Sequence, residues 1–267
     1  MTSPQTTNVD QGIPNTSWGL IKDPTRQLRD GYLTKTPIFQ FILLSICFPM
    51  WGAAASMNDI LITQFKAVFD LSDVASAFVQ SAFYGGYFVI AIPASRVIRR
   101  TSYKTGLLIG LTVYIAGCML FFPASTMATY TVFLASLFAI AIGLSFLETS
   151  ANTYSSLIGD RKHATLRLNI SQTFTALGFL SGAVMGKFLV FEDGDALHSR
   201  IAAAGSEAAR MEITEAALGR TLGPYKIILA ILVVLVVLIA ITQYPHCKPL
   251  NSDAKEAEAS IGETLAY

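Results

Sequence analysis

Charged residues are scarce in this sequence. Asp, Glu, Lys and Arg make up 14% of its 267 residues, whereas a soluble domain carries about 25% of its residues as these four types. Hydrophobic residues make up 52% of the chain. Because so little charge cannot cover a water-facing surface, the composition excludes an ordinary soluble globular protein and indicates a chain that meets lipid.

An excess of charge of one sign is also lacking. The 19 Lys and Arg residues nearly balance the 18 Asp and Glu residues, which leaves a formal net charge of +1. Nucleic-acid binding needs a concentrated excess of cations to neutralise phosphates. We therefore expect no nucleic-acid partner.

Cysteine and histidine are few and scattered. Their positions show no spacing typical of a metal site, a disulfide or a nucleophile beside its base. These residues are Cys47, Cys118, Cys247, His163, His198 and His246. We therefore expect no metal site, no cofactor and no enzymatic activity. An intramembrane enzyme stays open as a third hypothesis, although the sequence supplies no nucleophile or metal set for it.

Long apolar runs are the dominant feature that is present. A helix needs about 20 apolar residues to cross a bilayer, so the chain can hold about six spans with their loops. The predicted spans are residues 38–64, 75–97, 103–123, 128–157, 168–191 and 223–244. The sequence therefore predicts an all-α polytopic membrane protein with a six-helix bundle over residues 38–244.

The segments outside the spans are polar. Residues 1–37 contain four prolines and no apolar run that could form a signal peptide, which predicts a disordered cytoplasmic tail. Residues 245–267 predict a polar cytoplasmic tail or a truncated linker to a second bundle. The joint at 192–222 is long, and its segment 199–218 has a helical composition. We expect an extracellular loop there, with a surface helix that serves as a solvated connector.

Basic residues in the short joints set the orientation. The joints at 96–104 and 161–167 each carry several Lys or Arg residues, whereas the joints at 65–74 and 124–127 are poor in them. Because short cationic loops stay on the cytoplasmic side, these two joints and both chain termini are predicted to be cytoplasmic. We expect a multi-pass protein of the cell membrane, plasma or inner.

Two acidic residues lie deep inside the predicted spans, Asp59 and Glu148. A carboxylate at membrane depth is costly unless it is protonated, paired or hydrated, and no basic residue within the spans is placed to pair with either acid. Protonation removes the charge. Both residues are therefore candidate proton-binding groups.

Polar residues accompany these acids at helical spacing. Ser145, Glu148, Asn152 and Ser155 are separated by three, four and three residues, which places them on one face of a helix. Amides, hydroxyls and aromatic rings around a wet cavity suit a neutral polyol such as a sugar. The candidate substrate-binding residues are Asn58, Gln80, Tyr84, Asn152, Asn169, Gln172 and Thr175.

A structural role competes with ligand binding for these side chains, because polar residues in spans also join helices by hydrogen bonds. Joining helices is the favoured role for four hydroxyl residues, Ser81, Ser155, Thr173 and Thr175. Packing is the favoured role for Tyr84 and Tyr87. For the two acids, function is favoured.

Four stretches resemble motifs of one family of sugar transporters. They are NDIL at 58–61, QSAFYGGYF at 80–88, LETSAN at 147–152 and RLNISQTF at 167–174. In order and spacing, together with GPYKII at 223–228, they resemble the L-fucose:proton symporter and glucose/galactose transporter family of the major facilitator superfamily. The resemblance extends from about Phe39 to Tyr244.

The resemblance implies a fold of two six-helix bundles that hold the sugar between them, with this chain as the N-terminal half. It also implies that Asp59 and Glu148 carry the proton coupling and that Gln172 lines the sugar cavity. Two places depart from the family pattern. Thr175 replaces a cavity asparagine, and an asparagine pair before NDIL becomes Ala54-Ala55 or Ala55-Ser56, depending on the alignment.

The leading hypothesis is proton symport of a fucose-, glucose- or galactose-like hexose. The expected partners are the sugar, protons, the lipid bilayer, and a C-terminal six-helix half or a second copy. A proton is preferred over sodium because two carboxylates suffice for a proton, whereas sodium needs several converging oxygens. The alternative is a truncated or non-transporting half, or a helix-bundle partner subunit of another membrane protein. The identity of the sugar stays open.

Overall fold

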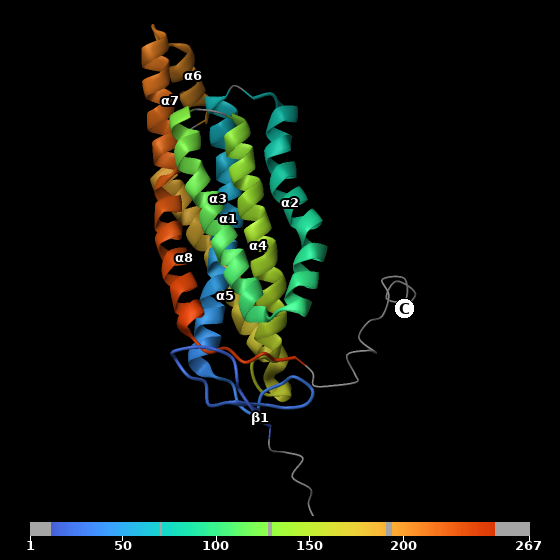
Figure 1. Cartoon of the computed structure of the whole chain (residues 1–267). Coiled ribbons are helices and arrows are strands. Elements are labelled where there is room, and N and C mark those ends of the chain that lie inside the picture. Colours follow the sequence, from blue (N-terminus) through green and yellow to red (C-terminus); the bar gives the residue numbers. More distant parts are fainter. Residues whose placement is uncertain (1–11, 70, 128–129, 191–193, 249–267) are drawn as a thin grey trace, which may run out of the picture.

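Long helices packed side by side form the molecule (Figure 1). The computed structural model describes residues 12–69, 71–127, 130–190 and 194–248. The helices are α1 (Ile38–Val68), α2 (Asp73–Arg100), α3 (Tyr103–Met127), α4 (Tyr130–Leu157), α5 (Ala164–Met185), α6 (Gly194–Ala202), α7 (Glu207–Thr221) and α8 (Gly223–Ile241). A 3-10 turn, η1 (Arg161–His163), precedes α5, and a π-helical turn, η2 (Gly186–Val190), follows it. The predicted helical architecture is confirmed.

In the part of the chain that the structure describes, five segments are long and apolar enough to cross a membrane. They are Ile38–Ile62, Asp73–Arg100, Tyr103–Pro123, Tyr130–Leu157 and Glu207–Ile241. Each of them overlaps one of the predicted spans. The predicted span at 168–191 is a helix, α5, but α5 is not among the five, because Asn169, Gln172 and Thr173 make it less apolar than the others.

Close backbone contacts join the helices in pairs. α3 packs along α4, and α1 packs along α5. A Cβ at Gly143 of α4 would lie 2.5 Å from the backbone nitrogen of Tyr114, and a Cβ at Gly178 of α5 would lie 2.3 Å from the carbonyl oxygen of Pro49. Small residues at such points let helices approach closely in a membrane, where packing replaces the hydrophobic effect.

Two segments that are distant in sequence lie together across one end of the bundle (Figure 1). Residues 12–37 and 242–248 are here named the clasp. Within it, β1 (Ile13–Pro14) pairs antiparallel with β2 (Arg26–Gln27). The backbone N–H of Gln243 donates to the carbonyl of Ile21 at 2.8 Å. The disordered tail predicted over 1–37 is therefore wrong for residues 12–37.

The physical reason is that the two segments satisfy one another's polar groups. The backbone N–H of Asp23 donates to the side-chain oxygen of Gln243 at 2.8 Å, and the backbone N–H of Cys247 donates to the side-chain oxygen of Gln27 at 3.0 Å. Paired in this way, a polar and proline-containing segment gains order without an apolar face of its own. The remaining parts of the predicted tails, 1–11 and 249–267, lie outside the described residues.

Three basic side chains cap the helices that end at the clasp. Lys248 donates to three carbonyl oxygens at the end of α2, Lys104 to two at the end of α8, and Arg167 to two at the end of α4, over 2.6–3.2 Å. These carbonyls have no intrahelical partners, and a cation there also offsets the helix dipole. Lys104 and Arg167 belong to the basic joints that predicted the orientation, so the same residues have a structural role.

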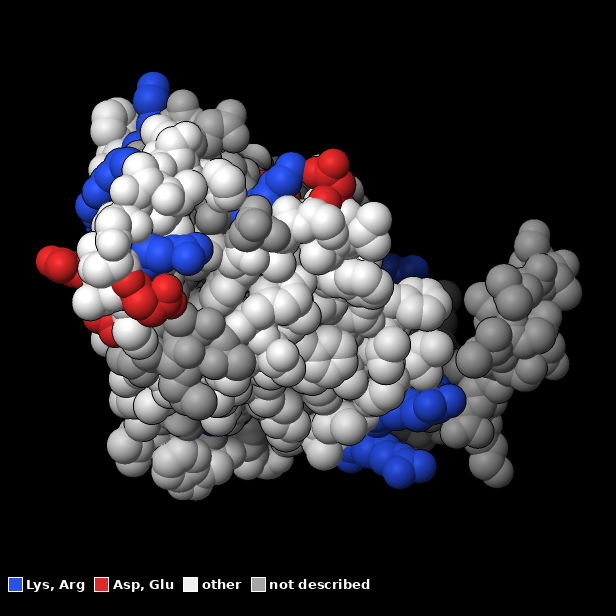
Figure 2. Space-filling view, turned by 90° about the horizontal axis from the view of Figure 1, so that it is seen from above, with Lys and Arg blue, Asp and Glu red and all other residues white. Residues whose placement is uncertain are grey.

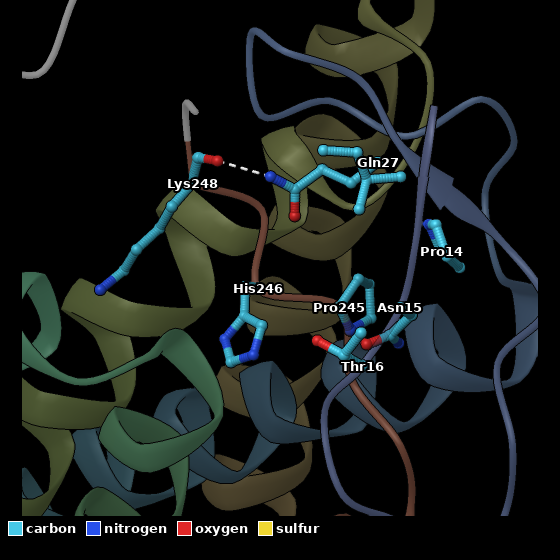
Figure 3. A pocket seen from close by; sticks show the side chains of 8 residues that line it. Pro14, Asn15, Thr16, Gln27, Pro245, His246 and Lys248 are labelled. Carbon is cyan, nitrogen blue, oxygen red and sulfur yellow. Dashed lines mark hydrogen bonds between the residues drawn. The ribbon is translucent and has the colours of Figure 1, made fainter. Parts of the chain in front are cut away.

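The N-terminal part of the clasp contacts each of these capping residues. The carbonyl of Trp18 accepts from Lys104 at 3.2 Å, and the hydroxyl of Thr36 accepts from Arg167 at 3.5 Å. The side chain of Gln27 donates to the backbone carbonyl of Lys248 (Figure 3). The clasp thus ties the ends of α2, α4 and α8 into one unit.

A pocket of about 300 Å³ lies inside the clasp (Figure 3). It is lined by Ile13, Pro14, Asn15, Thr16, Gln27, Pro245, His246 and Lys248. Neither acid from the predicted spans lines this pocket, so it belongs to the clasp and not to the candidate transport site.

At the opposite end, the segment predicted to form one surface helix forms two. α6 ends at Ala202, and α7 begins after Ser206, whose side chain accepts from the backbone N–H of Ala209 at 3.2 Å. A serine in this position starts a new helix, which explains the break. Seen onto this end, acidic and basic side chains gather at the rim, and the middle is uncharged (Figure 2).

Candidate functional site

Glu148 lies on α4 and is half-buried. Its side chain helps to line a small cavity between α1 and α4, of about 10 Å³. The other lining residues are Cys47, Phe48, Trp51, Leu147 and Ala151. Among the described residues, no cation pairs with Glu148. The site therefore holds a carboxyl group in mostly apolar surroundings without a compensating charge among the described residues.

One turn further along α4, an amide pair joins two helices. Nε2 of Gln172 on α5 donates to Oδ1 of Asn152 on α4 at 2.8 Å. Both side chains are half-buried, so part of each amide stays open to a ligand. These two predicted residues lie together on the same side of α4 as Glu148, because positions 148 and 152 are one turn apart.

Asp59 lies apart from Glu148. It is exposed on α1, eight residues beyond Trp51, which lines the Glu148 cavity. Eight residues span about 12 Å of helix, so the two acids do not share one pocket. Among the described residues, no cation pairs with Asp59. The side chain of Thr63, one turn on from Asp59, lies outside the described residues.

Asn58 and Thr175 are buried with unpartnered polar atoms. Asn58 has 0% exposure, and neither atom of its amide has a hydrogen-bond partner among the described residues. The hydroxyl of Thr175, on α5, is unpartnered in the same way. Buried polar atoms of this kind are uncommon in native proteins and mark places where water or a ligand is accommodated. Asn58 thus points into the bundle, whereas its neighbour Asp59 is exposed.

The other predicted binding residues are on the surface of the bundle. Gln80 and Tyr84 on α2 and Asn169 on α5 are exposed, Tyr84 by 53%. None of the three lines the Glu148 cavity. An exposed polar face on an apolar helix is available to a second protein unit or to a water-filled space.

Of the four hydroxyls predicted to join helices, Thr175 has no hydrogen-bond partner among the described residues, and the other three divide into two groups. Ser155 on α4 lies 2.8 Å from the hydroxyl of Ser171 on α5, so it does join helices. Ser81 and Thr173 instead donate to carbonyls of their own helices. The latter two satisfy themselves locally, which is the usual alternative for hydroxyl residues in apolar helices.

Two aromatic residues of the site were not predicted. Trp51 lines the Glu148 cavity and packs edge-on against Phe179 of α5, with ring centroids 6.4 Å apart. Tyr87 on α2 was assigned to packing, but its hydroxyl is buried without a partner among the described residues. An aromatic ring in an apolar run gives no sequence signal that separates a cavity-facing from a lipid-facing position.

No set of three His, Cys, Asp or Glu side chains able to hold a metal ion occurs in the described part of the chain. What the arrangement offers chemically is a carboxyl group that can gain or lose a proton, with amides and rings beside it. Such groups suit binding of a proton and of a neutral hydroxyl-rich molecule.

Comparisons with known proteins show similarity to membrane transporters of sugars. A family model described as Major Facilitator Superfamily matches residues 41–266. The L-fucose-proton symporter of Escherichia coli (strain K12) is 36% identical over 233 residues, which are 87% of this chain and 53% of the symporter. The glucose/galactose transporter of Brucella abortus biovar 1 is 34% identical over 224 residues, which are 83% of this chain and 51% of the transporter.

A solved structure is also similar. The crystal structure of a major facilitator transporter, FucP, in the outward conformation matches with a TM-score of 0.70 at 36% identity, over 86% of this chain and 55% of that chain. The chain thus spans about half the length of the relatives it matches. The family model covers most of the sequence, and the helices share the solved fold. The chain therefore belongs to the Major Facilitator Superfamily, a family of multi-pass membrane transporters.

Proposed function

We propose that this chain is the N-terminal six-helix half of a proton-coupled transporter for a fucose-, glucose- or galactose-like hexose. The observation that carries the proposal is Glu148, a half-buried carboxyl group in an apolar span without a cationic partner among the described residues. Relatives that share a third or more of their aligned residues are a fucose-proton symporter and a glucose/galactose transporter.

In this proposal α1 to α5 and α8 are the six spans, and both termini face the cytoplasm. The placement of residues 12–37 and 242–248 at one end of the bundle supports it, because that end also carries the basic joints. Short basic joints remain on the cytoplasmic side. The polar content of α5 fits a span that faces a cavity more than lipid.

The two acids act as successive stations for one proton. Asp59 lies toward the outer end of α1, and Glu148 lies on the returning α4, so the proton would reach Asp59 first from outside. Protonation of Glu148 removes a charge whose burial is costly when the cavity closes. Sugar and proton then favour the same closed conformation, which is the condition for coupling.

The amides of Asn152 and Gln172 bind sugar hydroxyls through the polar atoms that their mutual hydrogen bond leaves free. The exposed residues Gln80, Tyr84 and Asn169 contribute from the rim of the cavity that forms against a second bundle. Asn58 and Thr175 contribute through their unpartnered atoms once water enters.

A second candidate function requires no transport by this chain, which spans about half the length of each of these relatives. In it the chain is a non-transporting half or a partner subunit of another membrane protein. The DNA downstream of the codon for Tyr267 distinguishes the two functions. A reading frame for six further spans there supports a transporter made of two separate halves, and its absence supports a non-transporting half. Co-purification of such a half supports the first function.

The proposal is tested by sugar binding to purified protein, alone and with a C-terminal half, against a panel of hexoses. Glu148→Gln is expected to remove the pH dependence of binding. Glu207→Gln, a matched change on the exposed start of α7, is expected to leave it unchanged. Equal pH dependence in the wild type and Glu148→Gln would refute a role for Glu148 in coupling.

A further inference from the structure

One buried hydroxyl near Glu148 donates to no acceptor among the described residues. It belongs to Tyr87 on α2, whose ring packs against Phe83 at a centroid distance of 5.7 Å. A hydroxyl that loses its water partners without gaining a protein partner costs free energy. Such a group in a native protein marks a functional role or a place for an ordered water.

The backbone of Tyr87 lies against α4 one helical turn from Glu148. The hydroxyl of Ser145 on α4 donates to the backbone carbonyl of Tyr87 at 3.2 Å, which fixes α2 against α4 at this level. Ser145 and Glu148 are three residues apart and share one face of α4. The side chain of Trp51 lies close to the Tyr87 hydroxyl, and Trp51 and Glu148 line the same cavity.

The other titratable groups in this region are engaged or turned away. They are Cys47 and Asp59 on α1, Tyr84 on α2 and Tyr114 on α3. The thiol of Cys47 faces the carbonyl of Leu43 in its own helix, and the hydroxyl of Tyr114 faces a carbonyl of α1 at 3.4 Å. Asp59 and Tyr84 are exposed. Glu148 is therefore the acceptor placed for Tyr87 among the described residues.

We propose that Tyr87 is a positioning residue for Glu148: its hydroxyl donates a hydrogen bond to the Glu148 carboxylate whenever that group is deprotonated. The inference rests on the proposed function, because it assigns a partner to the proton site. The proton moves only on and off the Glu148 carboxyl oxygen, and the Tyr87 hydroxyl keeps its own. When Glu148 is protonated, the donor is released and the carboxyl group is free to turn toward the sugar.

Tyr87→Phe tests this, since it removes the hydroxyl and keeps the ring. Without the donor, the charged form of Glu148 loses stabilisation, so sugar binding is expected to persist to a pH about one unit higher. Affinity at acidic pH is expected to stay the same. Ser81→Ala, which removes an exposed hydroxyl of α2 that donates to the carbonyl of Ala77 in its own helix, is the matched control and is expected to leave the profile unmoved. A purely structural role would weaken binding by the same factor at every pH, and that result would overturn the inference.

Infrared spectroscopy of the purified chain supplies a readout that needs no sugar. The C=O stretch of protonated Glu148 is assigned by its loss in Glu148→Gln, and in Tyr87→Phe it is expected to persist to higher pH. If the band responds to Tyr87→Phe but no hexose binds, the proposed function fails and the positioning role stands. If a hexose binds with a pH dependence that Tyr87→Phe leaves unmoved, the positioning role fails. Absence of any titrating band also overturns it.

Discussion

Gln172 on α5 donates a hydrogen bond of 2.8 Å to Asn152 on α4, one helical turn from Glu148. This pair has two consequences for the site. It joins two helices, and it presents the free atoms of two amides beside a carboxyl group.

Gln172→Ala is expected to weaken sugar binding about tenfold, because the loss of one or two amide hydrogen bonds is worth about 1–1.5 kcal/mol. Calorimetric titration with the hexose that binds best is the measurement. Thr173→Ala is the matched control, since that neighbouring hydroxyl donates to its own helix and is exposed. Equal weakening by both variants would show that Gln172 acts only through the stability of α5.

Lys248→Met is expected to destabilise the clasp. The ammonium group donates to three carbonyls at the end of α2, and loss of such a cap costs about 1 kcal/mol at a site that is partly exposed to solvent. Thermal unfolding in detergent micelles measures the effect. Lys162→Met, an exposed lysine before α5, is expected to leave the transition unchanged. If the clasp unfolds before the bundle, the unfolding curve has two transitions, and Lys248→Met lowers the temperature of the first one only.

Asp160, between α4 and α5, predicts a loss of stability in acid. Desolvation opposes its ionisation, but the hydrogen bond and charge of His163 and the charge of Arg167 outweigh it and hold the pKa of Asp160 below its usual value of 3.8. A carboxyl group with a lowered folded-state pKa contributes stability that is complete above the unfolded value. That contribution is lost as pH falls through the folded value.

Asp160→Asn is therefore expected to lower the unfolding temperature near neutral pH and to flatten its decline below about pH 4. His163→Ala, which removes the main hydrogen-bond partner, is expected to act in the same direction. Unfolding temperatures measured across this pH range provide the comparison. An Asp160→Asn curve that runs parallel to the wild-type curve at every pH would contradict the assignment.

Gly178→Ala is expected to destabilise the α1–α5 contact by about 1–3 kcal/mol, because the new methyl group would meet the carbonyl of Pro49. Gly219→Ala in α7 is the matched control. Nothing lies within 4 Å of a Cβ at that position, so the change is expected to be neutral or to stabilise the helix by up to about 1 kcal/mol. The free energy of unfolding of both variants, measured by chemical denaturation, is the test. Crowding predicts a loss for Gly178→Ala only, whereas helix propensity alone predicts a gain for both.

The helices were predictable because the length of each apolar run can be counted directly in the sequence. α1 begins at Ile38 and α4 ends at Leu157, as the apolar runs indicated. The clasp was not predictable, because its order comes from pairing between Ile21 and Gln243, more than 200 residues apart. A polar segment with prolines gives no local signal of a distant partner.

The candidate site was predictable in part for a similar reason. The free-energy cost of a charged carboxylate inside a membrane span singles out Glu148 in the sequence, and helical spacing places Asn152 beside it. Spacing does not say which face of a helix is buried, so the burial of Asn58 next to the exposed Asp59 needed the packed bundle. Tyr87 was missed because an orphan hydroxyl exists only relative to the helices around it.

The most direct test of the central claim is uphill sugar uptake into liposomes that contain this chain with a C-terminal six-helix half, under an imposed pH gradient. The account predicts accumulation by the wild-type pair, which Asp59→Asn abolishes. Asp73→Asn, a change at an exposed acid that pairs with Lys66 at the start of α2, is expected to preserve it. Full accumulation by Asp59→Asn would contradict the account.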